Sequence, residues 1–420
     1  IVHRKLLEKG NVLGNALVDM YAKCGLLTKA RHVLEELPSR DVISWNALIA
    51  GFSHYSQGHE ALKCFESMQN EGLSPNEITF TCVLKACGST GSIEKGKQIH
   101  EEIANRGLLW KDIVLGSALV DMYVKCGDLG KAQRVLEELP VRNVVSWSAL
   151  IAGYSKQGQH LEALSCFERM QDEGLSPDVV TYICVLKACD HTKTMNKVKQ
   201  IHNDIVMRGL LEKNDVLGNV LVDIYVKCGN LSEARSILGE LSAKDVISWS
   251  TLISGCAQQG QGYKALECFE RMKKEGFYPD VVTFTCILKA CTSVGAIDKG
   301  KKVHEDILSG RFLDKSIMLG NALVDMYAKC GLITKAAQVL ENLPVRNVVS
   351  WNAFIGGYAQ EGHKALNCFT HMQTEGVLPD EITFLCMLNA CRHSHKLDEA
   401  QKHYEDMRTI TRMKPMLEHH

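Results

Sequence analysis

The sequence repeats itself with a period of 102 residues, and this period constrains the fold more than any other feature. The segment at residues 15–76 returns in nearly the same form from Ser117, from Asn219 and from Asn321. One tryptophan in each period keeps the spacing without slipping: Trp45, Trp147, Trp249 and Trp351. A period of this length is typical of stacked repeats, in which each unit buries its apolar face against its neighbours. The 420 residues are therefore predicted to form one repeat array without an internal domain boundary.

Each period divides at recurring turn residues into a short unit of 31 residues, an ordinary unit of 35 and a long unit of 36. We expect residues 1–10 to end an earlier long unit, and the last round to contain a shortened ordinary unit and an incomplete long one. The expected units are 11–41, 42–76 and 77–112; 113–143, 144–178 and 179–214; 215–245, 246–280 and 281–316; and 317–347, 348–380 and 381–420.

Each unit is predicted to form two helices. In unit 42–76, Trp45, Leu48 and Phe52 lie at helical spacing, and a turn with a glycine follows at residues 56–58. A second apolar stripe then runs along the chain at Ala61, Leu62, Phe65 and Met68. Helices of under about 15 residues are marginal alone, so they must stack. No segment alternates like a strand, and the pattern predicts an all-α, helix-turn-helix solenoid.

Sixteen of the 17 cysteines fall on four repeated positions, and only Cys256 stands alone. No C-x-x-C occurs, so zinc-ligand spacing is missing. We predict reduced core residues, with no metal site and no cofactor. The four sets are Cys24, Cys126, Cys228 and Cys330; Cys64, Cys166, Cys268 and Cys368; Cys82, Cys184, Cys286 and Cys386; and Cys87, Cys189, Cys291 and Cys391.

Charge and hydropathy exclude two classes of function. The formal net charge is −1, so strong binding to nucleic acid through phosphates alone is not expected. The apolar runs are too short to cross a bilayer, which predicts no membrane partner. No signal or transit peptide opens the chain, whose first nine residues resemble residues 205–213 instead.

A tetratricopeptide solenoid that holds a peptide in its groove is the main alternative. Trp45, Leu48, Phe52 and Phe65 fit the spacing of its signature, but Ile49 stands where a small glycine is expected. The alternation of unit lengths also departs from one uniform length of 34 residues, and this alternation argues against the alternative.

The phrases NALVDMYAKCG at 321–331, DVISWNALIAG at 41–51 and TCVLKACGSTGSIEKGKQIH at 81–100 resemble the plant pentatricopeptide-repeat family, specifically its PLS class. This resemblance covers essentially the whole chain. It implies a right-handed superhelix of helical hairpins that binds single-stranded RNA along its concave face, one base per repeat. It also implies a place in chloroplasts or mitochondria, and a role in specifying sites of cytidine-to-uridine editing.

The second residue of each unit is apolar and, with one exception, β-branched. Such side chains can form rigid walls against which a base stacks, although the residues alone equally allow a place in the core. The set is Val12, Ile43, Ile78, Val114, Val145, Val180, Val216, Ile247, Val282, Met318, Val349 and Ile382.

The fifth residue of each short and ordinary unit is always Asn or Ser. Small polar groups are costly in a core without partners, and they can read the edge of an unstacked base. An N-cap role is the competing interpretation. The set is Asn15, Asn46, Ser117, Ser148, Asn219, Ser250, Asn321 and Asn352. The long units have Thr81, Ile183, Thr285 and Leu385 there, and Ile and Leu cannot select a base.

The last residue of each short and ordinary unit is always Asp or Asn, which by itself is typical of an N-cap. The set is Asp41, Asn76, Asn143, Asp178, Asp245, Asp280, Asn347 and Asp380. The family resemblance adds a code, in which fifth and last residues Asn/Asp favour U, Asn/Asn accept C or U, Ser/Asn favour A and Ser/Asp favour G. For this chain it implies 5′-U-(C/U)-n-A-G-n-U-G-n-(C/U)-U-3′, where n faces a long unit.

Four lysines end the first helix of the short units and suit either a phosphate or the helix C-terminus. They are Lys23, Lys125, Lys227 and Lys329. The tryptophans are predicted to be core, because their spacing matches the apolar stripe.

We expect no enzyme activity from this chain. H-x-E occurs at His100 and His403, but a zinc deaminase also needs C-x-x-C. The long units are candidate docking sites for an accessory editing factor.

Overall fold

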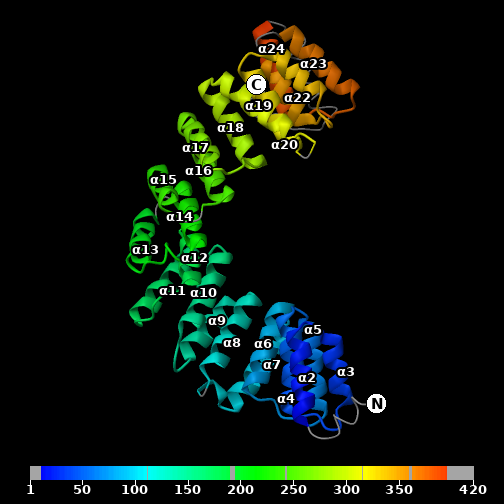
Figure 1. The fold of residues 1–420 in the computed structure, drawn as a ribbon, viewed down its shortest axis with the longest axis vertical. Helices are drawn as coiled ribbons and strands as arrows, with labels where there is room; N and C mark the ends of the chain where they lie inside the picture. Colours follow the sequence, from blue (N-terminus) through cyan, green and yellow to red (C-terminus); the bar gives the residue numbers. More distant parts are fainter. Residues whose placement is uncertain are drawn as a thin grey trace. The chain divides into compact units, whose positions relative to one another are not determined.

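The structure, a computed structural model, describes residues 11–110, 112–189, 194–241, 244–314, 316–358 and 362–394. Within these ranges the regular elements are 23 α-helices and one short 3-10 helix, η1 (Leu108–Trp110), and none is a strand (Figure 1). The predicted all-α fold is confirmed. No helix in the described ranges is both long and apolar enough to span a membrane.

The helices follow one another as pairs, and each pair corresponds to one of the expected units. The first helices are α2 (Asn11–Lys23), α4 (Val42–His54), α6 (Glu77–Thr90), α8 (Ile113–Lys125), α10 (Val144–Lys156), α12 (Val179–Ala188), α14 (Asp215–Lys227), α16 (Val246–Gln258), α18 (Val281–Val294), α20 (Ile317–Lys329), α22 (Val348–Gly357) and α24 (Glu381–Ser394). The second helices are α3 (Leu27–Glu36), α5 (Gly58–Asn70), α7 (Ile93–Asn105), α9 (Leu129–Glu138), α11 (His160–Asp172), α13 (Met195–Met207), α15 (Leu231–Glu240), α17 (Gly262–Lys274), α19 (Ile297–Ser309), α21 (Ile333–Glu341) and α23 (Gly362–Thr374).

The described residues group into two compact units, whereas the sequence predicts a single array. The first unit comprises the described residues up to 189 together with residues 194–204, and the second begins at Ile205. Both units have the same internal architecture of stacked helix pairs.

Within each compact unit the helices form two layers. Each first helix packs on the first helix of the next pair, as α4 does on α2 and on α6. Each second helix packs mainly on its own first helix, as α5 does on α4 and α17 does on α16 (Figure 1). The first-helix layer therefore brings residues at equivalent positions of successive units next to one another.

The apolar stripes form the core between these layers. In the second helix pair the side chains of Leu48 and Ile49 are fully buried, as are those of Ala61 and Met68. Burying a side chain of this size stabilises the fold by about 1.5–3 kcal/mol. The tryptophans are also buried, with 0% exposure at Trp147, and their predicted core role is confirmed.

A glycine in the ordinary first helices lets neighbouring first helices approach closely. A Cβ atom built on Gly51 would lie 2.8 Å from the Cβ of Ala22 in the preceding short unit. The equivalent Gly153 would place a Cβ 2.7 Å from Val124. Real Cβ atoms do not come this close, so the layer of first helices depends on these glycines.

Candidate functional site

The second residues of the units lie on the surface of the first-helix layer. Their exposed fractions run from 48% at Val282 to 84% at Val12, so the interpretation of these residues as core is wrong. The whole set is exposed: Val12, Ile43, Ile78, Val114, Val145, Val180, Val216, Ile247, Val282, Met318, Val349 and Ile382. Single exposed apolar residues are normal, but the same position exposed in every described unit forms a recurring apolar feature.

The fifth residues lie inside the first helices, three residues beyond the second ones, so both positions share one helix face. The N-cap interpretation is therefore wrong for the fifth residues. Their side chains are buried or half-buried, with exposures of 8% at Asn46 and 6% at Ser117. Each exposed apolar second residue thus lies about one helical turn before a small polar residue that is less exposed.

In two short units, the asparagine at this position donates to the carboxylate that ends the unit. The Nδ2 of Asn15 lies 3.1 and 3.0 Å from the two carboxylate oxygens of Asp41. The Nδ2 of Asn219 lies 3.0 Å from Oδ2 of Asp245. Fifth and last residues, 26 positions apart in the sequence, are therefore direct neighbours in space.

The asparagines of the ordinary units make the same contact with their last residues. The Nδ2 of Asn46 donates to Oδ1 of Asn76 at 2.9 Å. The Nδ2 of Asn352 donates to Oδ1 of Asp380 at 2.8 Å.

The serine units are paired as well. The hydroxyl of Ser117 lies 3.1 Å from Oδ1 of Asn143 and 2.9 Å from the backbone carbonyl of Ile113. The hydroxyl of Ser250 lies 3.4 Å from Oδ1 of Asp280 and 2.6 Å from the carbonyl of Val246. A short polar side chain at the fifth position thus meets the last residue of its own unit.

The last residues are also N-caps, as their residue types predict. Oδ1 of Asn143 accepts from the backbone N–H of Ser146 at 2.8 Å, and Oδ1 of Asp41 accepts from Ser44 at the same distance. A cap of this kind is worth about 1 kcal/mol. Because a backbone N–H of the helix holds Oδ1 of each cap, the position of the other polar side-chain atom, Oδ2 of Asp or Nδ2 of Asn, is fixed as well.

The carboxylate of Asp41 is charged at neutral pH. Burial alone would raise its pKa, but hydrogen bonds from the Ser44 backbone and the Asn15 amide hold the pKa below its ordinary value. A charged carboxylate only accepts hydrogen bonds, so this cap presents acceptors to a ligand.

A threonine in the next long unit joins the pair of each ordinary unit, a contact that the sequence interpretation missed. The hydroxyl of Thr79 lies 2.6 Å from Oδ1 of Asn46 and 3.0 Å from Oδ1 of Asn76. That of Thr383 lies 2.7 Å from Oδ1 of Asn352. The signal in the sequence was the recurrence of threonine at the third position of every long unit: Thr79, Thr181, Thr283 and Thr383.

Two of these threonines contact serines. The hydroxyl of Thr181 lies 2.5 Å from that of Ser148 and 2.7 Å from Oδ1 of Asp178, so it links that pair indirectly. The hydroxyl of Thr283 lies 2.6 Å from that of Ser250.

After each short unit, the third position of the following ordinary unit is serine instead of threonine, and its hydroxyl has a different partner. Ser44 donates to the backbone carbonyl of Asp41 at 2.8 Å, and Ser248 donates to that of Asp245 at 2.9 Å. These hydroxyls complete the helix cap by bonding to the backbone of the last residue rather than to the side chain of a fifth residue. The two kinds of unit therefore differ in how the fifth side chain is held.

Three short-unit asparagines carry a buried polar atom without a partner among the described residues. The side-chain carbonyl oxygens of Asn15, Asn219 and Asn321 are buried and accept no hydrogen bond. Such an atom costs about 1–3 kcal/mol. A ligand that donates a hydrogen bond to this oxygen would remove the cost.

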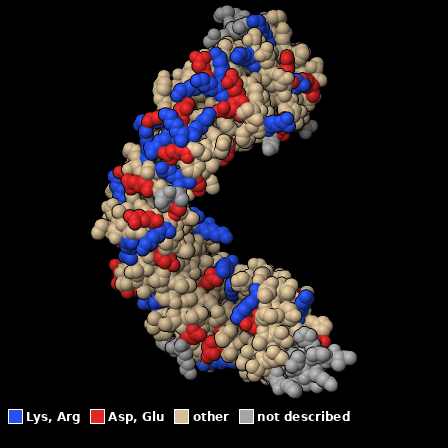
Figure 2. All heavy atoms as spheres, viewed as in Figure 1, with Lys and Arg blue, Asp and Glu red and all other residues tan. Residues whose placement is uncertain are grey.

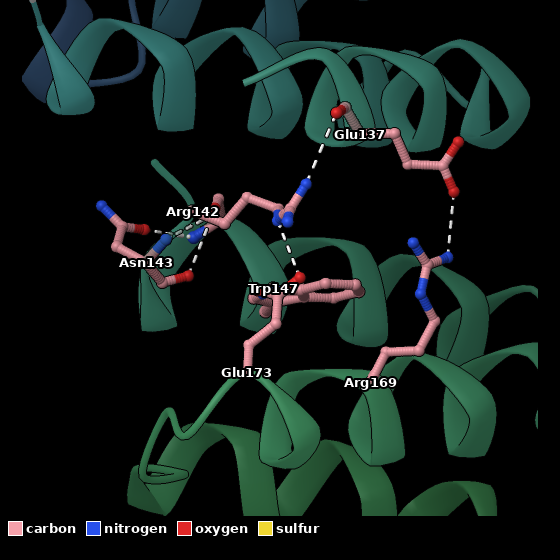
Figure 3. Close-up of polar contacts among 7 residues, drawn as sticks. Glu137, Arg142, Asn143, Trp147, Arg169 and Glu173 are labelled. Carbon is pink, nitrogen blue, oxygen red and sulfur yellow. Dashed lines mark hydrogen bonds and ion pairs between the residues drawn. The ribbon is translucent and has the colours of Figure 1, made fainter. Parts of the chain in front are cut away.

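A partly exposed polar network anchors the backbone next to the short-unit caps (Figure 3). Arg142, which precedes Asn143, forms an ion pair of 2.8 Å with Glu173. The indole N–H of Trp147 donates to the other oxygen of Glu173 at 2.9 Å. The guanidinium of Arg169 stacks over the indole at 5.3 Å and pairs with Glu137 at 2.9 Å.

The ion pair of this anchor recurs in every period, whereas the indole hydrogen bond is found at Trp45 and Trp147 but not at Trp249 and Trp351. The ion pairs equivalent to the one between Arg142 and Glu173 are Arg40–Glu71 at 3.0 Å, Lys244–Glu275 at 3.2 Å and Arg346–Glu375 at 3.2 Å. Side chains of the second helix thereby hold the residue before each short-unit cap, which makes the cap a rigid part of the site.

The four lysines end the short first helices as predicted, and each is already engaged. Lys23 pairs with Asp19 at 2.7 Å, and Lys329 pairs with Asp325 at 2.9 Å. The pairs of Lys125 with Asp121 and of Lys227 with Asp223 are equivalent. Exposed pairs of this kind are worth only about 0.3–0.5 kcal/mol, so a phosphate can replace the carboxylate.

The long units lack a fifth-to-last pair where the structure describes them. The hydroxyls of Thr81 and Thr285 donate to backbone carbonyls of their own helices, at 2.9 and 2.8 Å. Ile183 and Leu385 have no polar group to offer.

The cysteines are not uniformly buried, which corrects the prediction. All are free thiols, and the Cys87 set and Cys256 are buried, but Cys24 is exposed and several others are half-buried. Cys126 is half-buried, with its Sγ 3.7 Å from the carbonyl of Cys87 in the preceding long unit, whereas no described long unit precedes the unit of Cys24. Burial raises the pKa of the Cys87 thiol to about 12, so it remains protonated.

Removal of metal ions should leave this fold unchanged. Among the described residues no three His, Cys, Asp or Glu side chains gather as metal ligands. We expect the melting temperature of the purified protein to be the same with and without a strong chelator. A fall of several degrees, or stoichiometric zinc in elemental analysis, would contradict the interpretation of the cysteines as structural thiols.

The visible face of the described residues shows no large patch of one sign (Figure 2). On the face in Figure 2, basic and acidic side chains are interspersed over both compact units. This agrees with the formal net charge of −1 and puts the specific contacts, rather than a basic field, at the centre of any recognition.

The fold and the site define a class of protein: a helical-repeat solenoid in which most short and ordinary units carry a hydrogen-bonded pair of fifth and last residues beside an exposed apolar second residue. The PPR repeat family matches residues 40–89, 142–191, 244–293 and 346–393, and single PPR repeats match residues 15–42, 78–108, 117–144, 219–246, 321–348 and 382–410. The chain belongs to the pentatricopeptide-repeat family.

The similar curated proteins include several from Arabidopsis thaliana. One pentatricopeptide repeat-containing protein is 37% identical over 425 residues, which is 100% of this chain and 75% of that protein. Another, named chloroplastic, is 34% identical over 95% of this chain and 65% of its own length. A third, named mitochondrial, is 32% identical over 98% of this chain and 60% of its own length. The chain thus spans less than two thirds of some relatives.

Solved structures agree on the fold. The pentatricopeptide repeat protein PPR10, in complex with an 18-nt psaJ RNA element, matches 97% of this chain and 61% of its own with a TM-score of 0.72 and 19% identity. A second structure, of PPR10 from maize, matches 98% of this chain and 65% of its own with a TM-score of 0.54 and 22% identity. The predicted helical-repeat solenoid is confirmed.

Proposed function

We propose that this chain binds single-stranded RNA along its first-helix layer, with one base at each short and ordinary unit. The observation that carries the proposal is the pairing of fifth and last residues beside an exposed apolar residue, repeated through the array. A related family member is known in complex with RNA, which supports the same ligand class here. A base stacks between the apolar residues of successive units, and the polar pair meets its Watson–Crick edge.

The serine units differ in what their last residue presents. Asn143 uses Oδ1 to cap its helix and to accept from Ser117, which leaves its Nδ2 as a donor. One donor beside a hydroxyl suits adenine, whose edge carries an acceptor and an amino group. Asp280 has only acceptors, and beside Ser250 it suits guanine, whose edge carries two donors.

The asparagine units follow the same reasoning. The pairs of Asn15 with Asp41 and of Asn219 with Asp245 combine a carboxylate with a carbonyl oxygen that lacks a donor. The N3–H of uracil supplies a donor to such a site. Asn76 instead has a free Nδ2, because its Oδ1 caps α6, and this donor suits an acceptor on a pyrimidine.

Four lysines of the short units bind the phosphate backbone of the RNA. Lys23, Lys125, Lys227 and Lys329 exchange their carboxylate partners for phosphates as the strand binds.

The long units space the short and ordinary units along the RNA, and their surface is where an accessory editing factor docks. The array is of the PLS class, acts in a chloroplast or mitochondrion and specifies cytidine-to-uridine editing sites, while another protein or domain supplies the chemistry.

The second candidate is a scaffold that binds a peptide. The restriction of the fifth position to Asn or Ser argues against this function, because a peptide groove does not need the same small polar residue in every short and ordinary unit.

Selection from a random RNA pool tests the proposed function. We expect enrichment of 5′-U-(C/U)-n-A-G-n-U-G-n-(C/U)-U-3′, with the amino terminus of the chain at the 5′ end. A duplex of the same sequence should bind poorly, since its bases are stacked. Equal affinity for a scrambled single strand of identical composition would contradict base selection, and no affinity for any single strand would favour the scaffold.

A further inference from the structure

We propose that the threonine at the third position of each long unit is a specificity-determining residue of the ordinary unit before it. This inference rests on the RNA-binding function proposed above. The residues are Thr79, Thr181, Thr283 and Thr383, and all four side chains are fully buried. Each hydroxyl contacts both members of a base-selecting pair or forms the link between them.

The hydroxyl of Thr283 determines where the proton of Ser250 points. The carboxylate of Asp280 only accepts, so Thr283 donates its single proton to Oδ1 of Asp280 at 2.6 Å. The contact of 2.6 Å between Thr283 and Ser250 then requires Ser250 to donate to the threonine oxygen. The chain of hydrogen bonds turns the serine proton inward, and Ser250 faces a base with its lone pairs alone.

The inward orientation of the Ser250 proton makes unit 246–280 more selective for its base. With Ser250 and Asp280 both acting as acceptors, the site matches the two adjacent donors of guanine, N1–H and the 2-amino group, and disfavours a base with an acceptor at that place. Without the threonine hydroxyl, the serine proton is held only by the Val246 carbonyl at 2.6 Å and by Oδ1 of Asp280 at 3.4 Å. A base that offers an acceptor to Ser250 can then compete for this proton, and the unit becomes less selective for guanine.

The same hydroxyl sets the orientation of an asparagine. Thr79 donates to Oδ1 of Asn46 at 2.6 Å, which directs the Nδ2 of Asn46 to Asn76. The short unit of Asn15 is followed by serine, Ser44, at the position equivalent to Thr79, and Oδ1 of Asn15 has no partner among the described residues. The threonine therefore removes the free acceptor that distinguishes a short-unit asparagine from an ordinary-unit one.

The test measures dissociation constants of the whole chain for four RNAs that differ only at the base facing unit 246–280. For Thr283→Val, which keeps the shape and the backbone N–H of the cap, we expect the preference for G to fall about tenfold. Thr283→Ser keeps the hydroxyl and should retain most of the preference. The base facing unit 215–245 should still be selected as in the unmodified protein.

Ser248→Ala is the matched control. It removes a buried hydroxyl from the cap of α16 and is therefore expected to lower the melting temperature about as much as Thr283→Val. Since Ser248 donates to the Asp245 backbone, selection at unit 215–245 should not change. A change there equal to that at unit 246–280 in Thr283→Val would show a general effect of capping and overturn the inference.

If Thr283→Val does not fold, Thr79→Val tests the role of the threonine hydroxyl in another unit. It leaves Oδ1 of Asn46 without a donor, as in Asn15, so the base facing unit 42–76 should shift from C or U toward U. An unchanged preference in the valine variants, with selection intact in the unmodified protein, would make the threonines simple caps. Absence of any base preference in the unmodified protein would instead refute the proposed function itself.

Discussion

The double variant Ser117→Asn with Asn143→Asp should switch the base facing unit 113–143 from A to U. It reproduces the pair formed by Asn15 and Asp41, in a unit of the same length. A good base-edge contact is worth roughly 1–3 kcal/mol in DNA readout, which corresponds to about a ten- to hundredfold reversal of preference.

The structure explains why the backbone need not move. Asn143 and Asp41 cap their helices in the same way, through a serine N–H at 2.8 Å, so aspartate can replace asparagine in the cap. The exposed Val114 remains beside the pair. The new carboxylate removes the Nδ2 donor that suits adenine, and the new amide adds a carbonyl oxygen that suits the N3–H of uracil.

Dissociation constants for RNAs with each base at this one position measure the switch. Preferences at neighbouring positions should persist, because repeats contribute nearly independently. The single variants serve as controls and should give weaker or mixed preferences. If the double variant still prefers A, or loses all RNA binding while its helicity is normal, then these side chains are caps and do not select bases.

Trp147→Ala should unfold the unit that it anchors. The indole is 0% exposed, and its truncation removes packing worth about 3–5 kcal/mol. Glu173 also loses a hydrogen bond and Arg169 loses its aromatic partner. A 35-residue unit contributes only about 2–5 kcal/mol at roughly 0.05–0.15 kcal/mol per residue, so the loss equals the stability of the unit.

Val145→Ala is the matched control, two residues away on the same helix. Its side chain is 62% exposed, so thermal unfolding followed by circular dichroism should be nearly unchanged. RNA affinity should nevertheless fall several-fold, because a base loses its wall. The interpretation of the exposed apolar set is wrong if Val145→Ala destabilises the fold as Trp147→Ala does, or if it leaves RNA affinity unaffected.

The comparison of these two residues shows what the sequence can and cannot determine. Trp147 and Val145 are both apolar and recur with the same period, so periodicity alone leaves both as candidates for the core. Trp147 was assigned correctly because Leu150 and Ile151 continue its stripe at helical spacing, whereas Val145 stands outside that stripe. Whether such a residue is covered depends on where the neighbouring first helix lies, which is a tertiary property.

The sequence by itself determined the helix pairs, the apolar stripes and the caps, because these depend on contacts within about four residues along the chain. It also identified the fifth and last residues as unusual, since their chemistry recurs without an apolar substitute. Only the tertiary structure decided that Asn15 meets Asp41, that Thr283 joins Ser250 to Asp280, and that the second residues are exposed. Those contacts join residues 26 to 33 positions apart, and their geometry follows from the packing of one helix pair on the next rather than from local propensity.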